Sequence, residues 1–145
     1  MTMRLKCIMP FCAPGKQTIL KQLTVSGIEI AHLDEGKGPA VVIGHCSSAS
    51  HKEWLPLIET LKSDWRVLAP DFIGYGRSEP WPAEEPFSVD ADVKVLLAIA
   101  KKTKGPLHLV GHSYGAALAL EAARTLGLRF HACRGAMMSV PWWPP

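Results

Sequence analysis

The sequence predicts an α/β protein whose sheet is mostly parallel and begins with an antiparallel hairpin. From Ala40 onward, short apolar runs alternate with helical runs, a pattern that gives right-handed crossovers between parallel strands. Before Ala40, two β-like runs flank Ser26-Gly27, which suits a hairpin turn. A Gly-x-Ser-x-Gly turn at residues 111–115 joins a strand-like run to a helical run.

The composition is that of one soluble globular domain. The 145 residues are 48% hydrophobic and 20% charged, enough to bury a core. A formal net charge of +3 is too small to indicate a nucleic-acid partner, and the apolar runs fall short of the ~20 residues that span a bilayer. We therefore expect neither nucleic acid nor membrane as a partner.

The cysteines predict no metal site. Cys7, Cys12, Cys46 and Cys133 form no Cys-x-x-Cys pair and have no zinc-ligand spacing. Scattered cysteines of this kind indicate reduced thiols and a cytoplasmic location. With no phosphate-binding loop in the sequence either, we expect no cofactor.

The N-terminal region divides into a leader and the start of the domain. Residues 1–22 carry basic residues without an acid and a proline-broken apolar run, so we expect a loosely ordered leader before a domain at 23–145. Strands are predicted at 18–24 and 28–33. The Gly- and Pro-containing cluster 34–39 predicts an exposed turn.

Two buried strands and one helix follow. Residues 40–43 are continuously apolar, as a strand covered on both faces should be, and a loop of small residues follows at 44–50. Residues 53–61 predict a short amphipathic helix. A second buried strand is expected at 66–69, before a proline-rich loop that runs to Pro86.

The second half repeats this alternation. A helix is predicted at 89–102 with Ser88 as its N-cap, then a strand at 107–110. The run 116–126 is apolar nearly all round, which predicts a helix buried between the sheet and other structure. A last strand is expected at 135–140.

The turn at 111–115 provides the candidate nucleophile, Ser113. A serine between a strand and a helix is forced into a strained conformation, and side chains at Gly111 or Gly115 would collide with neighbouring elements. The strain points the hydroxyl outward, and the helix N-terminus favours negative charge there. The backbone N–H of Tyr114 is then placed as an oxyanion-hole donor. The alternative is that Ser113 is an ordinary N-cap residue.

With this turn, the loop after Ile43 and the segment at 71–78 in this order, residues 25–140 resemble the N-terminal half of an α/β-hydrolase. The resemblance implies a sheet whose first two strands are antiparallel and whose remainder is parallel, with the serine at its carboxyl edge. Asp71 and Arg77 are interpreted as structural rather than catalytic residues of their loop, and their opposite charges would allow an ion pair.

The resemblance also assigns the loop after residue 43. In that family it usually reads His-Gly-x-x and supplies the second oxyanion donor. Here the sequence is His45-Cys46-Ser47-Ser48, so the resemblance implies that the Ser47 N–H donates and that His45, Cys46 and Ser48 lie beside the pocket. Cys46 stands where glycine is usual; because the sequence offers it no base partner, we interpret it as a small packed residue rather than a reactive thiol.

A serine nucleophile needs a base and an acid that orients it, in this fold in the order serine, acid, histidine. After Ser113 the acid in the sequence is Glu121, inside the following helix, and the histidine is His131, before the last expected strand and so at the end opposite the serine. We therefore expect a chain truncated before the last strands and lid. His45 is a better substitute base than His112, although a loop-bracing role suits it more.

The other histidines and the sheet edge have structural interpretations. His32, His51 and His108 are interpreted as surface or strand residues. A truncated sheet would leave a bare edge through which the chain could self-associate, and its stability alone should be low.

These observations leave three functional hypotheses. The first is a serine hydrolase that cleaves a small ester, thioester or amide through an acyl-enzyme on Ser113. Serine in place of a carboxylate argues against epoxide hydrolase or dehalogenase chemistry, whereas cofactor-free oxidative chemistry or C–C bond hydrolysis stays open. The second is an inactive remnant or pseudoenzyme that binds a ligand or partner. The third, a nucleotide-binding domain, is disfavoured because the third glycine of Gly-x-Gly-x-x-Gly and the Walker lysine are missing.

Overall fold

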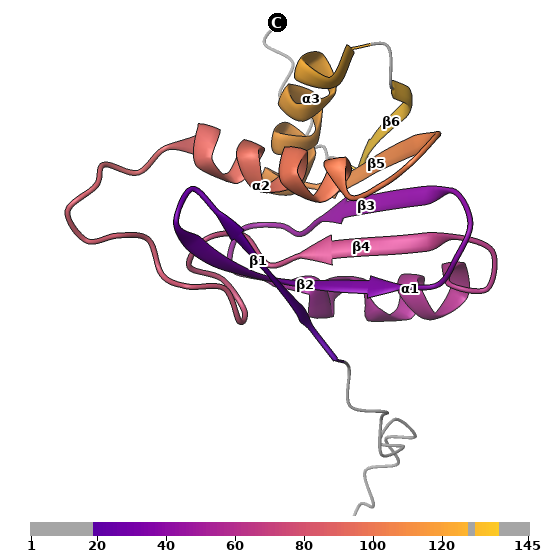
Figure 1. Ribbon diagram of the computed structural model, residues 1–145, viewed down its shortest axis with the longest axis horizontal. Helices are drawn as coiled ribbons and strands as arrows, with labels where there is room; N and C mark the ends of the chain where they lie inside the picture. The colour runs from indigo at the N-terminus through magenta and orange to yellow at the C-terminus, as the bar shows by residue number, and fades with distance from the viewer. Residues whose placement is uncertain (1–18, 128–129, 137–145) are drawn as a thin grey trace, which may run out of the picture.

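The computed structural model describes residues 19–127 and the backbone of residues 130–136. Its centre is a six-stranded sheet in the order β1-β2-β4-β3-β5-β6 (Figure 1). The strands are β1 (Lys21–Val25), β2 (Ile28–Glu35), β3 (Ala40–Gly44), β4 (Arg66–Pro70), β5 (Leu107–His112) and β6 (Phe130–Ala136). The helices are η1 (His51–Trp54), α1 (Leu55–Leu61), α2 (Val89–Lys101) and α3 (Tyr114–Leu126).

The strand directions confirm the predicted sheet. β1 pairs with β2, and β2 with β4, in antiparallel register. β3 lies parallel to both β4 and β5, and β5 lies parallel to β6. The hairpin turn between β1 and β2 is made by Ser26 and Gly27, both at positive φ. The sheet is therefore of the kind that the α/β-hydrolase resemblance implies.

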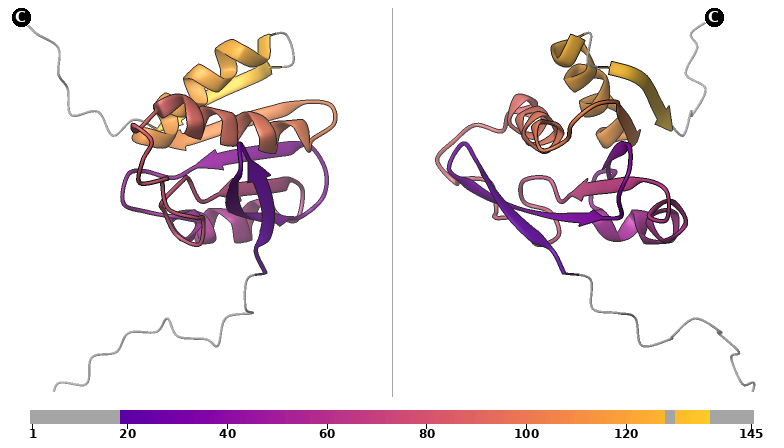
Figure 2. Two further views of the ribbon diagram at one scale, coloured as in Figure 1. Left: turned by 60° about the vertical axis from the view of Figure 1, so that its left-hand side comes forward. Right: turned by 45° about the vertical axis from the view of Figure 1, so that its right-hand side comes forward.

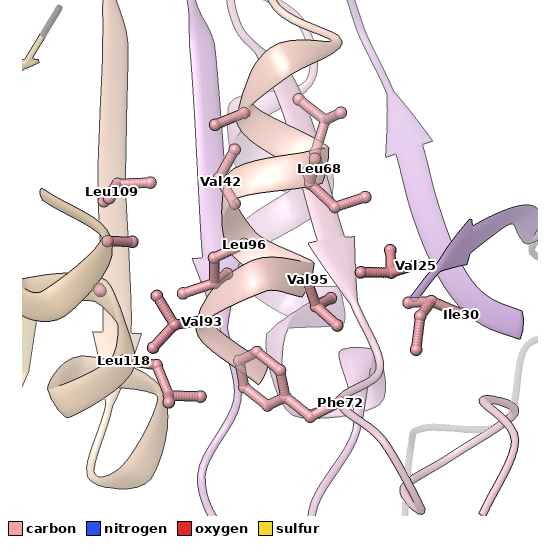
Figure 3. Close-up of a cluster of buried hydrophobic side chains, with 14 of the residues drawn as sticks. Val25, Ile30, Val42, Leu68, Phe72, Val93, Val95, Leu96, Leu109 and Leu118 are labelled. Carbon is pink, nitrogen blue, oxygen red and sulfur yellow. The ribbon is translucent and has the colours of Figure 1, made fainter. Parts of the chain in front are cut away.

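Helices cover both faces of the sheet (Figure 2). On one face, Ile58 of α1 packs in a cluster with apolar side chains of β2, β3 and β4. On the other face, α2 and α3 bury a larger cluster, in which Val93 and Leu96 of α2 gather with Val42 and Leu68 of the sheet and with Leu118 of α3 (Figure 3). This two-sided cover explains why β3 and residues 67–70 of β4 are continuously apolar.

Three boundaries differ from the sequence expectations. The last strand was expected at 135–140, and this range is wrong, because β6 spans Phe130–Ala136 and pairs Gly135 with Gly111 of β5. Residues 137–140 lie outside the described part. β1 begins at Lys21, inside the segment assigned to the leader, whose residues 1–18 also lie outside the described part. The helix expected at 53–61 is a 3-10 turn followed by α1, with a proline in the first turn of α1.

Candidate active site

Ser113 lies on a strained turn between β5 and α3. Its φ of 51° and ψ of −112° place it in a region that L-residues rarely adopt, and the residue is exposed. Its side chain makes no capping hydrogen bond to α3, so the N-cap alternative is not supported. The strand before it and the helix after it are both present, as predicted.

Close backbone packing explains the two glycines around Ser113. A Cβ on Gly115 would lie 2.6 Å from the carbonyl oxygen of His45 and would also collide with the backbone of Gly44. A Cβ on Gly111 would lie 2.5 Å from the nitrogen of Ala116. The first turn of α3 therefore rests directly on the ends of β3 and β5, which fixes the position of Ser113.

The loops after β3 and β4 and the turn after β5 meet at this edge of the sheet (Figure 1). Because these strands are parallel, their carboxyl ends lie together, and this is the edge at which open α/β sheets bind ligands. The polar side chains of the loops are linked by hydrogen bonds from one loop to the next.

His45 braces the first loop against the second. The backbone N–H of Phe72 donates to His45 Nε2 at 3.0 Å, so Nδ1 carries the proton and donates to the Cys46 carbonyl at 2.7 Å. The ring is fully buried, and this burial lowers the pKa of His45, which favours the neutral form. With both nitrogens occupied, His45 has the bracing role and is not placed to act as a base.

Asp71 organises the second loop from a fully buried position. Its carboxylate accepts hydrogen bonds from the backbone N–H of His51 at 2.6 Å, from His51 Nδ1 at 2.9 Å and from the backbone N–H of Arg77 at 2.9 Å. Burial alone would raise the pKa of Asp71, but these hydrogen bonds hold it below its usual range. Its contact with Arg77 is thus made through the backbone. The expectation that His51 is a surface or strand residue is wrong, because its ring is buried against Asp71 at the start of η1.

Tyr114 packs beside the turn. Its hydroxyl donates to Asp92 Oδ2 at 2.7 Å, and its ring lies edge-on to Phe72 with centroids 5.8 Å apart. Asp92 is buried in α2 and also accepts the backbone N–H of Ile73 at 2.9 Å. Burial raises the pKa of Asp92, and burial together with the hydrogen bond to Asp92 raises the pKa of Tyr114. These contacts anchor the residue whose N–H is the expected oxyanion donor.

Cys46, Glu53 and His112 form a further polar group, which includes the residue directly before Ser113. Glu53 Oε2 accepts the backbone N–H of Cys46 at 2.9 Å, and Glu53 Oε1 accepts a hydrogen bond from His112 Nδ1. Suitable ligand atoms of Cys46, Glu53 and His112 all lie within 4.8 Å of one another, and each residue is partly buried. Cys46 is a free thiol. The structure thus brings to Cys46 the histidine and carboxylate that its sequence neighbourhood did not offer.

The other expected oxyanion donor lies on the first loop. Ser47 and Ser48 are the exposed central residues of a turn closed by the Ala49 N–H and the Cys46 carbonyl at 3.3 Å. Ser48 has a φ of 64°, a conformation that normally favours glycine. The backbone N–H groups of this turn are therefore held close to the surface.

The remaining candidates lie away from Ser113. Glu121 pairs with Arg124 on the outer side of α3, at 2.5 Å, as its helical position predicts. His131 belongs to β6 and not to the link before it, near the end that pairs with Leu107 and so opposite the turn. His32 and His108 are strand residues, as predicted.

Sequence reasoning missed Glu53 and Asp92. Asp92 left a signal, since it lies four and seven residues before Leu96 and Ile99 on the buried face of α2, where an acid needs a partner. Glu53 left none, because its partners lie on two other segments of the chain.

None of the helices described by the structure combines the length and the apolar character that a membrane-spanning helix requires.

Comparisons with known proteins agree on one fold. A family model described as the alpha/beta hydrolase fold matches residues 39–143. The chain is similar to lipase LipV of Mycobacterium tuberculosis, with 45% identity over 58 residues that cover 39% of this chain and 21% of the lipase. It is also similar to an epoxide hydrolase of Caballeronia sordidicola, with 34% identity over 125 residues that cover 83% of this chain and 36% of that protein.

Among solved structures, an epoxide hydrolase from Vigna radiata superimposes with a TM-score of 0.74 at 26% identity, covering 87% of this chain and 41% of that chain. A membrane phospholipase A superimposes with a TM-score of 0.73 at 24% identity, which shows the shared fold alone. The chain therefore spans less than half the length of each of these proteins.

Proposed function

The chain belongs to the α/β-hydrolase fold family, and we propose that it carries the nucleophile of a serine hydrolase, with Ser113 attacking the carbonyl carbon of a small ester, thioester or amide. One observation carries the proposal: Ser113 is exposed, with a φ of 51° and a ψ of −112°, on the turn between β5 and α3. Strain of this kind, about 1–3 kcal/mol, persists only where the surroundings enforce it, and it is characteristic of functional residues.

The chemistry of a serine nucleophile favours one of the two activities for which the relatives of the chain are named, ester cleavage and epoxide opening. A carboxylate that opens an epoxide forms an ester, which water then cleaves. A serine hydroxyl attacking the same ring would form an ether, which an acyl-transfer site has no means to hydrolyse. Attack of Ser113 on a carbonyl instead forms an acyl-enzyme that water can cleave. The serine therefore favours the ester-cleaving class to which lipases belong over epoxide opening.

The oxyanion would be stabilised from two sides. When Ser113 Oγ adds to the carbonyl, its proton leaves to a base and the carbonyl oxygen becomes negative. The backbone N–H groups of Tyr114 and Ser47 are proposed to donate to this oxygen, at the N-terminus of α3, where the helix dipole also favours negative charge. Collapse of the tetrahedral intermediate breaks the bond to the alcohol, thiol or amine, which leaves with the proton held by the base, and water then cleaves the acyl ester on Ser113.

A second candidate is an inactive remnant or pseudoenzyme that binds a ligand or a partner. It is favoured by the hydrogen bonds of two histidines, since His45 is hydrogen-bonded at both ring nitrogens and His51 is paired with Asp71. Neither is placed to take the Ser113 proton. The two candidates differ in a single property, the reactivity of the Ser113 hydroxyl.

A fluorophosphonate probe measures that property. We expect covalent labelling of the 145-residue chain at one serine, identified by mass spectrometry, together with turnover of a short-chain p-nitrophenyl ester. Ser113→Ala should abolish both. If labelling persists in Ser113→Ala, the assignment of the nucleophile is wrong; if the folded wild-type chain takes no label, the inactive alternative is the better description.

Two substitutions at Ser47 test the second oxyanion donor. Ser47→Ala keeps the backbone N–H and should label at the wild-type rate, whereas Ser47→Pro removes that N–H at a turn position that accepts proline. Loss of one oxyanion donor typically costs ~100- to 1,000-fold in rate. Equal labelling rates in the two variants would refute the role proposed for the Ser47 N–H.

A further inference from the structure

We propose that Cys46, Glu53 and His112 form a binding site for a divalent transition-metal ion, of which Zn²⁺ is the best match. The residues come from the loop after β3, from η1 and from the end of β5, and one ligand atom of each lies within 4.8 Å of the other two. The proposal is independent of the role given to Ser113.

The set of donors selects the ion. Thiolate sulfur, imidazole nitrogen and carboxylate oxygen are the three ligand types that zinc takes in proteins, whereas Mg²⁺ and Ca²⁺ prefer oxygen throughout. Three protein ligands leave a fourth tetrahedral position for water, the arrangement typical of zinc sites that stay open to solvent. Each of the three residues is partly buried, so an ion can reach the site and still be shielded there.

The distances require little rearrangement. Zinc bonds of ~2.0–2.3 Å place neighbouring ligand atoms roughly 3.5 Å apart in a tetrahedron. Ligand atoms already within 4.8 Å need shifts on the order of 1 Å, which side-chain rotation can supply. The hydrogen bond between His112 and Glu53 would be replaced by their shared bonds to the ion.

The protein already orients two of the ligands. Glu53 is held by the backbone N–H of Cys46 at 2.9 Å, a contact that survives if only the other carboxylate oxygen binds the ion. His112 lies at the end of β5, whose backbone is paired with β3 on one side and β6 on the other. Hydrogen bonds that orient metal ligands in this way typically contribute 10- to 100-fold in affinity.

The same three residues could instead suggest a cysteine nucleophile with a histidine base. The Glu53 carboxylate lies within the same group as the Cys46 sulfur, and its negative charge opposes a reactive free thiolate there. A bound cation reverses this effect, because it stabilises the thiolate and places its positive charge beside Glu53. The arrangement is therefore better suited to an ion than to thiol chemistry.

Cobalt substitution tests the site directly. In a chain without a histidine tag, Cys7, Cys12 and Cys133 are replaced by serine, so that Cys46 is the remaining thiol. We expect one equivalent of Co²⁺ to produce the charge-transfer absorption of a cobalt–thiolate bond and the intense visible bands of four-coordinate cobalt, and Zn²⁺ to displace it. Glu53→Gln and His112→Gln should each weaken binding by at least ~10-fold.

His108→Gln is the matched control, because it removes another histidine of β5 whose ring packs on Trp65; it should leave the cobalt titration unchanged. Absence of the thiolate band, or titrations unchanged by both Glu53→Gln and His112→Gln, would overturn the proposal. A second measurement avoids variants that fold poorly: saturating Zn²⁺ should slow alkylation of Cys46 in the wild-type chain by at least ~10-fold. An unchanged alkylation rate would also overturn it.

Discussion

Replacing Gly115 with alanine should destabilise the protein although the residue lies in a helix. Helix propensity alone predicts a gain of about 1 kcal/mol for this substitution. In the structure, however, the new Cβ would collide with the carbonyl group of Gly44 and would lie 2.6 Å from the His45 carbonyl oxygen, where ordinary contact begins at 3.4 Å, so the backbone must move by more than the 0.8 Å missing at His45. The atoms that must move belong to the backbone at the end of β3, which is paired with β4 and β5.

Overpacking against backbone costs about 1–3 kcal/mol or more. All the colliding atoms belong to the backbone, so the cost should lie at the upper end of this range, about 3 kcal/mol. After the gain of about 1 kcal/mol in propensity, we expect Gly115→Ala to lower the free energy of unfolding by about 2 kcal/mol, measured by urea denaturation followed by circular dichroism. Ala117→Gly, at an exposed position of the same helix, is the control and should lose about 1 kcal/mol through propensity alone. A Gly115→Ala protein as stable as wild type would refute the argument that α3 is fixed by contact with the ends of the strands.

Three further substitutions test the buried polar groups by the free energy of unfolding. Asp92→Ala removes the acceptor of the Tyr114 hydroxyl and should cost about 1–3 kcal/mol, and a neutral result would contradict the anchoring role of Asp92. Asp34 accepts two hydrogen bonds from the Arg66 guanidinium, at 2.8 and 2.9 Å, which hold its pKa far below the ordinary value. The ion pair stabilises the protein fully above the pKa of Asp34 in the unfolded chain, near 3.8, and this stabilisation is lost as the pH falls toward the lower pKa of the folded state. The loss of unfolding free energy caused by Asp34→Asn should therefore shrink in acid. A loss that stays constant with pH would argue against the ion pair. Burial lowers the pKa of His32 from 6.5, so on acidification the unfolded chain takes up this proton before the folded protein does. The free energy of unfolding should therefore decline as the pH falls below about 6.5, and His32→Leu should reduce this decline. Identical pH profiles of the wild type and His32→Leu would refute the role given to His32.

The fold was predictable because its signals are local. A few neighbouring residues are enough to predict each of its main features. These features are the apolar strands β3, β4 and β5, the hairpin turn at Ser26 and the glycine-flanked turn at Ser113. The last strand was misplaced because residues 128–133 have no clear periodicity, whereas the run after Gly135 is more apolar. Pairing with β5, which is a long-range contact, selects residues 130–136 instead.

The candidate site was predictable only in part. The strained conformation of Ser113 follows from the five residues of its turn. The bonds that link the loops do not, because His51 and Asp71 are separated by 20 residues, and Glu53 and His112 by 59. Which polar partners meet depends on how the loop after β3 folds back over the sheet edge, and neither composition nor periodicity contains that information.

The strain at Ser113 has its own structural support, separate from any proton acceptor. The carbonyl of Ser113 accepts the N–H groups of Ala116 and Ala117 at 3.0 and 3.2 Å, β5 is paired on both sides, and the contact of Gly111 with the start of α3 leaves no room for the turn to relax. A cost of about 1–3 kcal/mol can be held in place by these contacts alone. The turn should therefore keep its shape whether or not a base reaches the serine. Stability measurements on Gly115→Ala and labelling of Ser113 thus probe different properties, and a chain that is stable yet unlabelled would show that the turn survives without its chemistry.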